Sequence, residues 1–160
     1  MEKMNEFEVM ISITGAFVAM LGASFFSFSI LSIGGSTMIL ASTGASALLV
    51  FGMPHSPASQ PWNIVGGHLV SAFIGVSCNL LMDNDILAAS VAVPLAMLVM
   101  HKLRCMHPPG GATAVTAIVG GVHVQELGYA FLIIPVLFNS IILLSFALAA
   151  GSLREKNPYE

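Results

Sequence analysis

Charged residues are scarce in this chain. Asp, Glu, Lys and Arg together make up 8% of its 160 residues, whereas hydrophobic residues make up 56%. A soluble domain carries about 25% charged residues, which keep its surface in water. The mean hydropathy of +0.90 agrees with this reading. The composition therefore excludes an ordinary soluble protein and favours a membrane protein of one compact domain.

Basic residues and cysteines are also scarce, and we expect no cleavable leader. Five Lys and Arg residues and a net charge of -3 cannot neutralise many phosphates, so we expect no nucleic-acid partner. Cys78 and Cys105 lie in separate apolar segments, which argues against a disulfide scaffold. The N-terminus lacks the cationic start of a secretory signal. We expect an uncleaved chain in a bacterial inner membrane, with an organelle membrane as the alternative.

Four apolar stretches are long enough to cross a bilayer, which takes about 20 residues. They cover about residues 11–33, 62–82, 86–100 and 128–150. Two further stretches, about 34–52 and 106–121, are rich in Gly, Ala, Ser and Thr and look too short or too weak for ordinary spans. We predict an all-α polytopic membrane helix bundle of about six membrane segments, two of them short discontinuous helices.

The two weak stretches resemble each other. GASA stands at residues 44–47 and GATA at residues 111–114. Each stretch is the second in a group of three hydrophobic segments, so the single domain, residues 1–160, divides into halves of about 10–82 and 86–152. Three crossings per half predict a 3+3 inverted repeat, as in many transporters. The alternative is chance, because small residues are common in membrane helices.

The basic residues predict the orientation, because Lys and Arg concentrate in cytoplasmic loops. Six crossings with the N-terminus inside place all five on the cytoplasmic side: Lys3, Lys102, Arg104, Arg154 and Lys156. Four crossings would move two of them, Lys102 and Arg104, to the outside. We therefore expect six crossings, with both termini cytoplasmic.

The segment HPPGG at residues 107–111 interrupts a hydrophobic region. Proline restricts the residue before it to extended geometry and suits the first turn of a helix. We therefore predict an extended segment up to Pro108 and a short helix from Pro109 or Gly110. The first N–H groups of a helix lack partners within it and carry about half a positive charge. In a membrane they need another partner, and Gly110 and Gly111 leave them open to a small anion.

The first half offers a counterpart in residues 42–46, which supply potential caps and a glycine. Inversion would direct the two short-helix N-termini at each other near the midplane and form a weak anion site, which suits an ion that must also leave. Helix packing through small residues is the alternative. His68 and Asn139 lie within predicted spans, where polar side chains usually face the bundle interior. His68 would donate to the anion or carry a proton; a histidine bonded to a carbonyl is the alternative.

These considerations define a candidate substrate-binding set. Its members are Thr43, Gly44, Ala45, Ser46, His68, His107, Pro109, Gly110, Gly111, Ala112, Thr113 and Asn139. The proline-rich loop at residues 53–62 is interpreted as a stiff cytoplasmic turn, or alternatively as a gate at the inner mouth.

Metal and enzyme chemistry find little support. His101, Cys105 and His107 do not have the spacing of a strong zinc site. The sequence contains none of the GxSxG, HExxH or P-loop motifs. We therefore expect no catalytic residues, no metal site and no cofactor.

Several motifs resemble those of the HPP family of integral membrane proteins. They are GASALLVFG (44–52), VGGH (65–68), HPPGGATA (107–114), GG (120–121) and Pro135, with Pro54, Ser56-Pro57, Gln60-Pro61 and Asn63 between the first two. The residue after the namesake triplet is often Ala in this family and is Gly110 here. Some members are implicated in nitrite transport, so the resemblance implies a small-anion transporter with nitrite as the leading substrate. The family is described with four membrane helices, which differs from our six segments.

Three functional hypotheses follow. The first is a channel or carrier for a small inorganic anion. The second is a non-transporting membrane scaffold or sensor, and the third is a His-ligated redox or metal protein. At 16.7 kDa the chain is small for a transporter, so we also expect a homodimer or another homo-oligomer within the lipid bilayer.

Overall fold

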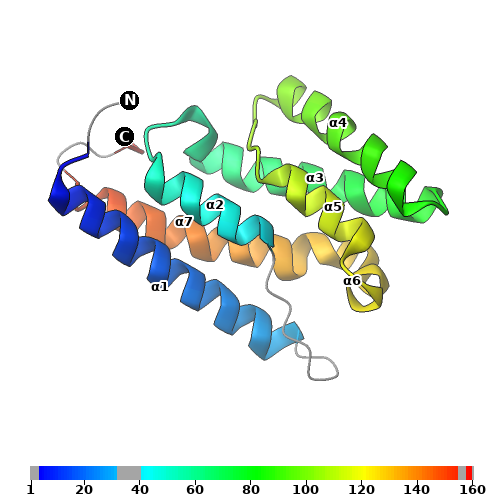
Figure 1. Ribbon diagram of the computed structural model, residues 1–160, viewed down its shortest axis with the longest axis horizontal. Coiled ribbons are helices and arrows are strands. Elements are labelled where there is room, and N and C mark those ends of the chain that lie inside the picture. Colours follow the sequence, from blue (N-terminus) through cyan, green and yellow to red (C-terminus); the bar gives the residue numbers. More distant parts are fainter. Residues whose placement is uncertain (1–3, 32–40, 155–157, 160) are drawn as a thin grey trace.

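The computed structural model (Figure 1) describes residues 4–31, 41–154 and 158–159. Within these ranges all regular structure is helical, which confirms the predicted all-α class. The helices are α1 (Glu6–Leu31), α2 (Ala41–Gly52), η1 (Pro57–Ser59), α3 (Pro61–Leu81), α4 (Asp85–Leu103), α5 (Gly110–Val119), α6 (Val122–Leu127), η2 (Gly128–Leu132), η3 (Ile133–Leu137) and α7 (Phe138–Gly151).

Within the described residues, four helical stretches are long and apolar enough to cross a membrane. They are Glu6–Ser29, Pro61–Leu81, Asp85–Leu103 and Val122–Gly151. The predicted short helices are also present, because α2 has 12 residues and α5 has 10. The last stretch bends at Ile134, whose backbone is not helical (φ -124°, ψ 114°), just before Pro135. The sequence therefore identified the four long spans and the two short helices.

Large apolar side chains cover the outside of the bundle. Phe25 on α1 is 70% exposed, and Ile86 on α4 is 80% exposed. Such a surface is unfavourable in water and suits hydrocarbon. The inner face of α4 instead repeats a small residue every four positions, at Ala88, Ala92 and Ala96, which pack in one buried cluster with residues of α3 and α5. Small side chains allow helices to approach closely in a membrane.

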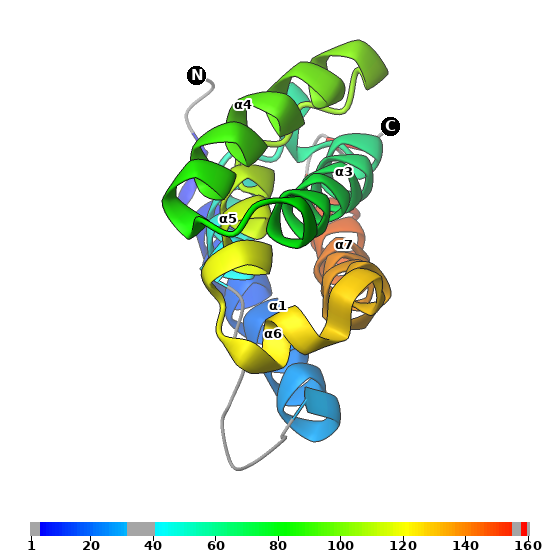
Figure 2. The same cartoon turned by 90° about the vertical axis from the view of Figure 1, so that its right-hand side faces the viewer.

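Helix α3 is the central element and packs against α4, α5 and α7. The approach of α5 to α3 depends on glycine: a Cβ atom on Gly75 would lie 2.5 Å from the Ala114 carbonyl oxygen and 2.9 Å from Ala114 Cα. Helices α1, α2 and α7 form a second group, joined to the first where α2 meets α5 and where α7 meets α3. Figure 2 views these helices nearly end-on.

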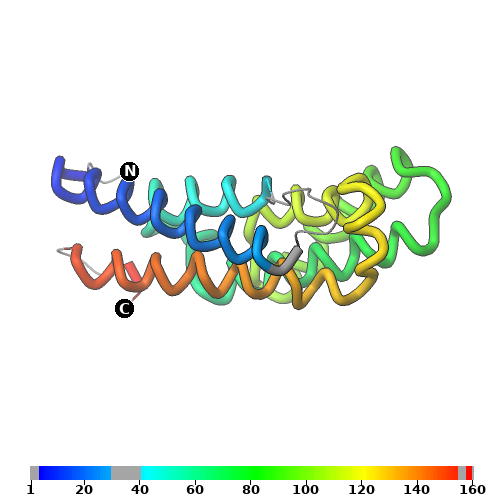
Figure 3. Tube along the Cα trace, turned by 90° about the horizontal axis from the view of Figure 1, so that it is seen from below, coloured from blue at the N-terminus to red at the C-terminus, as the bar shows by residue number. Residues whose placement is uncertain are grey.

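The two short helices run in opposite directions. Each begins near the middle of the molecule, and α2 then runs toward the end that holds the start of α1 and the end of α7, while α5 runs the other way (Figures 1 and 3). Because α2 already begins at Ala41, Ser42 and Thr43 lie in its first turn. The positive N-terminal ends of both helices thus lie in the interior.

Hydrogen bonds gather several chain segments at one end. The Trp62 indole N–H donates to the Leu103 carbonyl at 3.1 Å, and Gln60 Nε2 donates to the Pro158 carbonyl at 3.1 Å. Arg154, which is 8% exposed, donates from Nη2 to Ser12 Oγ at 2.9 Å. The beginning of α3, the end of α4 and the segment after α7 are therefore tied together.

Candidate functional site

His68 is buried at the centre of α3, with 4% of its surface exposed. Both ring nitrogens have a side-chain partner. Nε2 lies 2.8 Å from Ser46 Oγ on α2, and Nδ1 lies 2.7 Å from Thr113 Oγ1 on α5. The histidine therefore connects the two short helices through their hydroxyl groups.

His107 is fully buried beside it and belongs to the same network. Its Nε2 lies 2.9 Å from Ser46 Oγ, and its Nδ1 lies 2.7 Å from the carbonyl oxygen of Ala58. The two imidazole centroids are 4.8 Å apart at an interplanar angle of 65°. We call Ser46, His68, His107 and Thr113 the histidine cluster. Its polar atoms are all engaged, as buried polar groups generally are.

The partners determine where the protons lie when both rings are neutral. The Ala58 carbonyl only accepts, so His107 Nδ1 donates to it and His107 Nε2 accepts from the Ser46 hydroxyl. Ser46 has a single hydrogen, so its oxygen accepts from His68 Nε2–H. His68 Nδ1 then accepts from the Thr113 hydroxyl. The cluster is thus a directed chain of four hydrogen bonds from Thr113 to Ala58.

The residues of the histidine cluster lie in segments of the sequence without charged residues. No Asp, Glu, Lys or Arg occurs between residues 9 and 82 or between residues 105 and 125. Among the described residues, the hydrogen-bond partners within the cluster are hydroxyl groups, imidazoles and one backbone carbonyl. The described residues also contain no group of three His, Cys, Asp or Glu side chains placed to hold a metal ion. The two cysteines are free and buried.

Ser46 and Thr113 occupy the same position in the two similar motifs, the third residue of GASA and of GATA. The structure brings these two hydroxyls to opposite nitrogens of one ring. A packing stripe of small residues would not need this pairing. The similarity between the motifs therefore has a physical counterpart in the way His68 is held.

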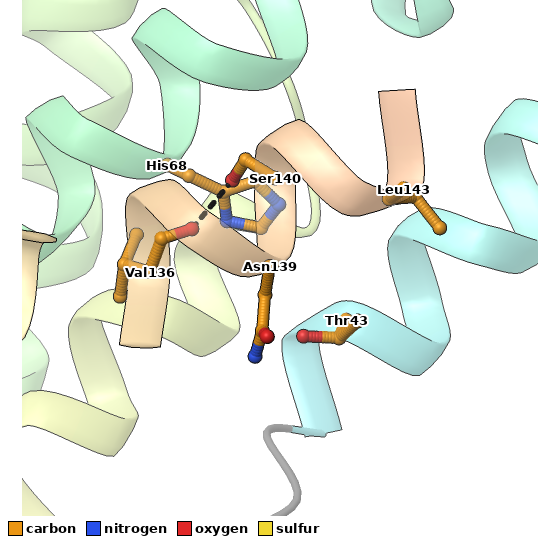
Figure 4. Close-up of a pocket in the computed structure, with 6 residues that line it drawn as sticks. All are labelled: Thr43, His68, Val136, Asn139, Ser140 and Leu143. Atoms are coloured by element: carbon orange, nitrogen blue, oxygen red, sulfur yellow. Dashed lines mark hydrogen bonds between the residues drawn. The ribbon is translucent and has the colours of Figure 1, made fainter. Parts of the chain in front are cut away.

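A small polar cavity adjoins the cluster (Figure 4). It is lined by Thr43, His68, Val136, Asn139, Ser140 and Leu143 and has a volume of about 10 Å³. A space of this size admits about one water molecule. Asn139 also exchanges hydrogen bonds with Ser27 on α1, with Nδ2 donating to Ser27 Oγ at 3.0 Å. His68 thus faces both the cluster and the cavity.

The expected open amides at the start of α5 are not found. The amide of Gly110 donates to the His107 carbonyl at 2.9 Å, and that of Gly111 donates to the Pro108 carbonyl at 3.0 Å. The next amide, that of Ala112, donates to the Pro109 carbonyl at 3.1 Å. The reason is that the two prolines precede the helix as a turn: they have no N–H of their own, and their carbonyls accept from the next amides.

Several predicted residues lie away from the cluster. A Cβ atom on Gly111 would face Val93 on α4 at 3.9 Å, one on Gly44 would face Met20 on α1 at 4.0 Å, and one on Gly110 would meet Ser71. Three others line an outward apolar groove of about 560 Å³ between α2 and α5, namely Ala45, Pro109 and Ala112. The structure thus brings together Ser46, His68, His107 and Thr113 in the cluster, and Thr43 and Asn139 with His68 around the cavity.

Sequence reasoning missed three contributors. Ser140 and Ser27 each had a signal, because a polar residue inside an apolar span is uncommon. The third contributor is the Ala58 carbonyl, which belongs to the loop interpreted as a turn or gate. A backbone atom gives no sign in residue type, so only the fold shows that this loop contacts His107.

The comparisons with known proteins agree with the membrane architecture. All 160 residues match the family described as HPP, transmembrane region. Two transmembrane proteins of Dictyostelium discoideum are 34% and 38% identical to it over 126 and 125 residues, each covering 76% of this chain. The matched part is 44% and 40% of those relatives, so the chain spans less than half of their length. No solved structure matches. The chain belongs to the HPP family of integral membrane proteins and corresponds to its transmembrane region.

Proposed function

We propose that this protein is a membrane transporter or channel for a small monovalent anion, with nitrite as the leading substrate. The observation that carries the proposal is the pairing of His68 with equivalent hydroxyls of two oppositely directed short helices. Ionisable side chains inside a membrane bundle are costly to bury and mark transport pathways or relays more often than structural sites.

The surroundings suit a negative rather than a positive solute. The N-terminal ends of α2 and α5 lie in the interior, where their dipoles contribute partial positive charge. Hydroxyl and amide groups of Thr43 and Asn139 offer donors around the cavity, which the His68 ring also lines. Since the α5 amides are engaged, we assign contact with the anion to these side chains and the long-range attraction to the helix dipoles.

The layout supports six crossings and an inverted repeat as parts of this proposal. The short helices α2 and α5 begin in the interior and run in opposite directions, which suits two half-length crossings. Their matching motifs contact one shared histidine. An inverted pair of broken helices around a central site is the arrangement of several secondary transporters.

Passage requires the site to change shape. The cavity beside His68 has room for about one water molecule, whereas nitrite has three heavy atoms. The structure therefore corresponds to a closed state, and widening between α2, α3 and α7 would admit the ion. We further propose a homo-oligomer in a bacterial inner membrane with both termini cytoplasmic, and we assign no catalytic step to the chain.

Uptake by proteoliposomes tests the proposal. Vesicles that contain the purified protein should take up nitrite faster than protein-free vesicles do. Competition by nitrate, formate and chloride then measures the selectivity. His68→Ala should remove this uptake, whereas His55→Ala should retain it, because His55 is exposed in the loop before η1. Uptake of none of the four anions above the protein-free baseline would refute transport and favour a scaffold.

A further inference from the structure

We propose that each anion crosses together with one proton, which is bound by the histidine cluster. The inference rests on the proposed function and adds the coupled ion. It is carried by the directed hydrogen-bond chain, by the cavity that shares His68 with this chain, and by the lack of a fixed counter-charge around both.

The chain can take up one proton through the rotation of a single hydroxyl group. A proton arriving at His68 Nδ1 turns this nitrogen from an acceptor into a donor to Thr113 Oγ1, 2.7 Å away. The Thr113 hydroxyl hydrogen then needs a new acceptor. The Pro109 carbonyl lies one helical turn earlier and accepts from the Thr113 amide at 3.4 Å. Thr and Ser in helices commonly donate to the carbonyl four residues back, as Thr116 does to Ala112 at 2.8 Å.

The proton can also lie on the other ring. When His68 Nε2 passes its proton to Ser46 and Ser46 passes its own to His107 Nε2, the Ser46 hydroxyl donates to His68 Nε2 and accepts from His107 Nε2–H, while His68 Nδ1–H still donates to Thr113. The proton can therefore move between the two rings through Ser46 without leaving a buried donor unpaired. One proton enters from the side of uptake and leaves on the other side, and no covalent bond of the chain changes.

The protonated cluster would lack a counter-ion in the protein. The groups that face it are hydroxyls and amides from three helices, Thr43 on α2, Thr113 on α5, and Asn139 and Ser140 on α7. On the connecting segments the Ala58 carbonyl accepts from His107, and the thiol of Cys105 packs against Gly66. Within the described chain these groups include no carboxylate, ammonium or guanidinium.

An anion in the cavity supplies the missing charge. An isolated charge buried away from water is very unfavourable, whereas a hydrogen-bonded pair of opposite charges is far less so. His68 lines the cavity, so an anion there would lie next to the protonated ring and would neutralise its charge at short range. The proton then favours binding of the anion, and the anion favours binding of the proton by the same factor.

The two rings, 4.8 Å apart, would repel each other if both were charged, which limits the uptake to one proton.

The test measures protons and nitrite in the same vesicles. Proteoliposomes containing a trapped pH-sensitive dye are given an inward nitrite gradient, with potassium and valinomycin holding the membrane potential at zero. Since nitrous acid crosses lipid unaided, protein-free vesicles set the baseline. The expected result is acidification of the lumen with one proton per nitrite above the baseline, and uptake that does not change when a potential is imposed.

A matched pair of variants locates the proton. Thr113→Val keeps the shape but removes the hydroxyl that must accept from His68, so both nitrite-driven acidification and nitrite uptake should fall roughly tenfold, the equivalent of one buried hydrogen bond of about 1.4 kcal/mol. Thr116→Val removes a hydroxyl of the same helix that bonds within α5 and should retain wild-type rates of acidification and uptake.

The outcomes separate this inference from the proposed function. Nitrite uptake without acidification, whether it carries current or exchanges for another anion, overturns proton coupling and leaves anion transport standing. Equal rates of acidification and of nitrite uptake in the two threonine variants overturn the role of the cluster. The absence of any nitrite uptake above baseline overturns the proposed function and the inference that rests on it.

Discussion

The short helices α2 and α5 present the same motif to the same histidine but are supported differently. In α5 the motif follows His107, Pro108 and Pro109, whose carbonyls engage the first amides of the helix. At the equivalent positions before the other motif the sequence has Leu40, Ala41 and Ser42. The second half of the chain therefore supplies His107, a proline turn and Thr113, whereas the first supplies Ser46, His68 and the Ala58 carbonyl.

The two motifs also differ in the number of hydrogen bonds that their hydroxyl groups make to the histidines. Ser46 contacts both His68 and His107, whereas Thr113 contacts only His68. The two halves are therefore similar in layout and unequal in chemistry: the first half carries Ser46, the junction of the proton chain, and its accepting end at the Ala58 carbonyl, whereas the second carries its donating end at Thr113. Experiments on the two halves should show this inequality.

The largest expected effect concerns membrane topology, because a labelled position lies either on one side of the membrane or on the other. If α2 and α5 each complete a crossing, single cysteines at Leu103 and Leu153 face one side of the membrane, and single cysteines at Ile86 and Val122 face the other. All four positions are at least half exposed. Labelling with an impermeant maleimide reads the side directly, and the native Cys78 and Cys105 are buried, which keeps the background low. Grouping of position 103 with position 122 would make α5 re-entrant and end the comparison of two crossing halves.

Removal of the shared histidine should produce the next largest effect. His68→Ala deletes both side-chain contacts between the short helices and opens space next to an existing cavity, so we expect a loss of about 2–5 kcal/mol. Thermal unfolding in detergent measures it, with His123→Ala, at an exposed position on α6, as the control. An unchanged melting temperature would show that His68 does not join the two halves.

Truncation of each hydroxyl in turn should rank the two halves. Ser46→Ala leaves two imidazole nitrogens without a partner, whereas Thr113→Val leaves one. At about 1–3 kcal/mol for each unsatisfied buried group, the serine variant should lose roughly twice as much stability. Parallel chemical or thermal unfolding of the two variants measures the ratio, and equal losses would contradict the junction role of Ser46.

The sequence predicted the helices better than it predicted their contacts. Length and hydropathy identify the long spans, and HPPGG identifies the start of α5 at Gly110, because proline and glycine act locally. The expectation of open amides at Gly110 and Gly111 was wrong for a related reason: whether a carbonyl turns back to those amides depends on the backbone of the prolines. His68 and His107 stood out as polar residues in apolar segments, but nothing in residue type indicated that Ser46 would lie between them.

The smallest effect concerns the glycines of the two motifs, Gly44 and Gly111. Their substitution tests whether the ion contacts the backbone there or whether these positions simply accept a larger side chain. A Cβ atom would find its nearest neighbour at 4.0 Å on Gly44 and at 3.9 Å on Gly111, so both alanine variants should fold, with a gain of up to about 1 kcal/mol from helix propensity. Gly75→Ala is the contrasting case, because its Cβ atom would lie 2.5 Å from the Ala114 carbonyl oxygen, and overpacking of this kind costs about 1–3 kcal/mol. Nitrite uptake should survive in Gly44→Ala and Gly111→Ala, since neither Cβ atom faces the cavity beside His68. A folded Gly111→Ala variant without nitrite uptake would instead indicate that the ion binds to the backbone of α5.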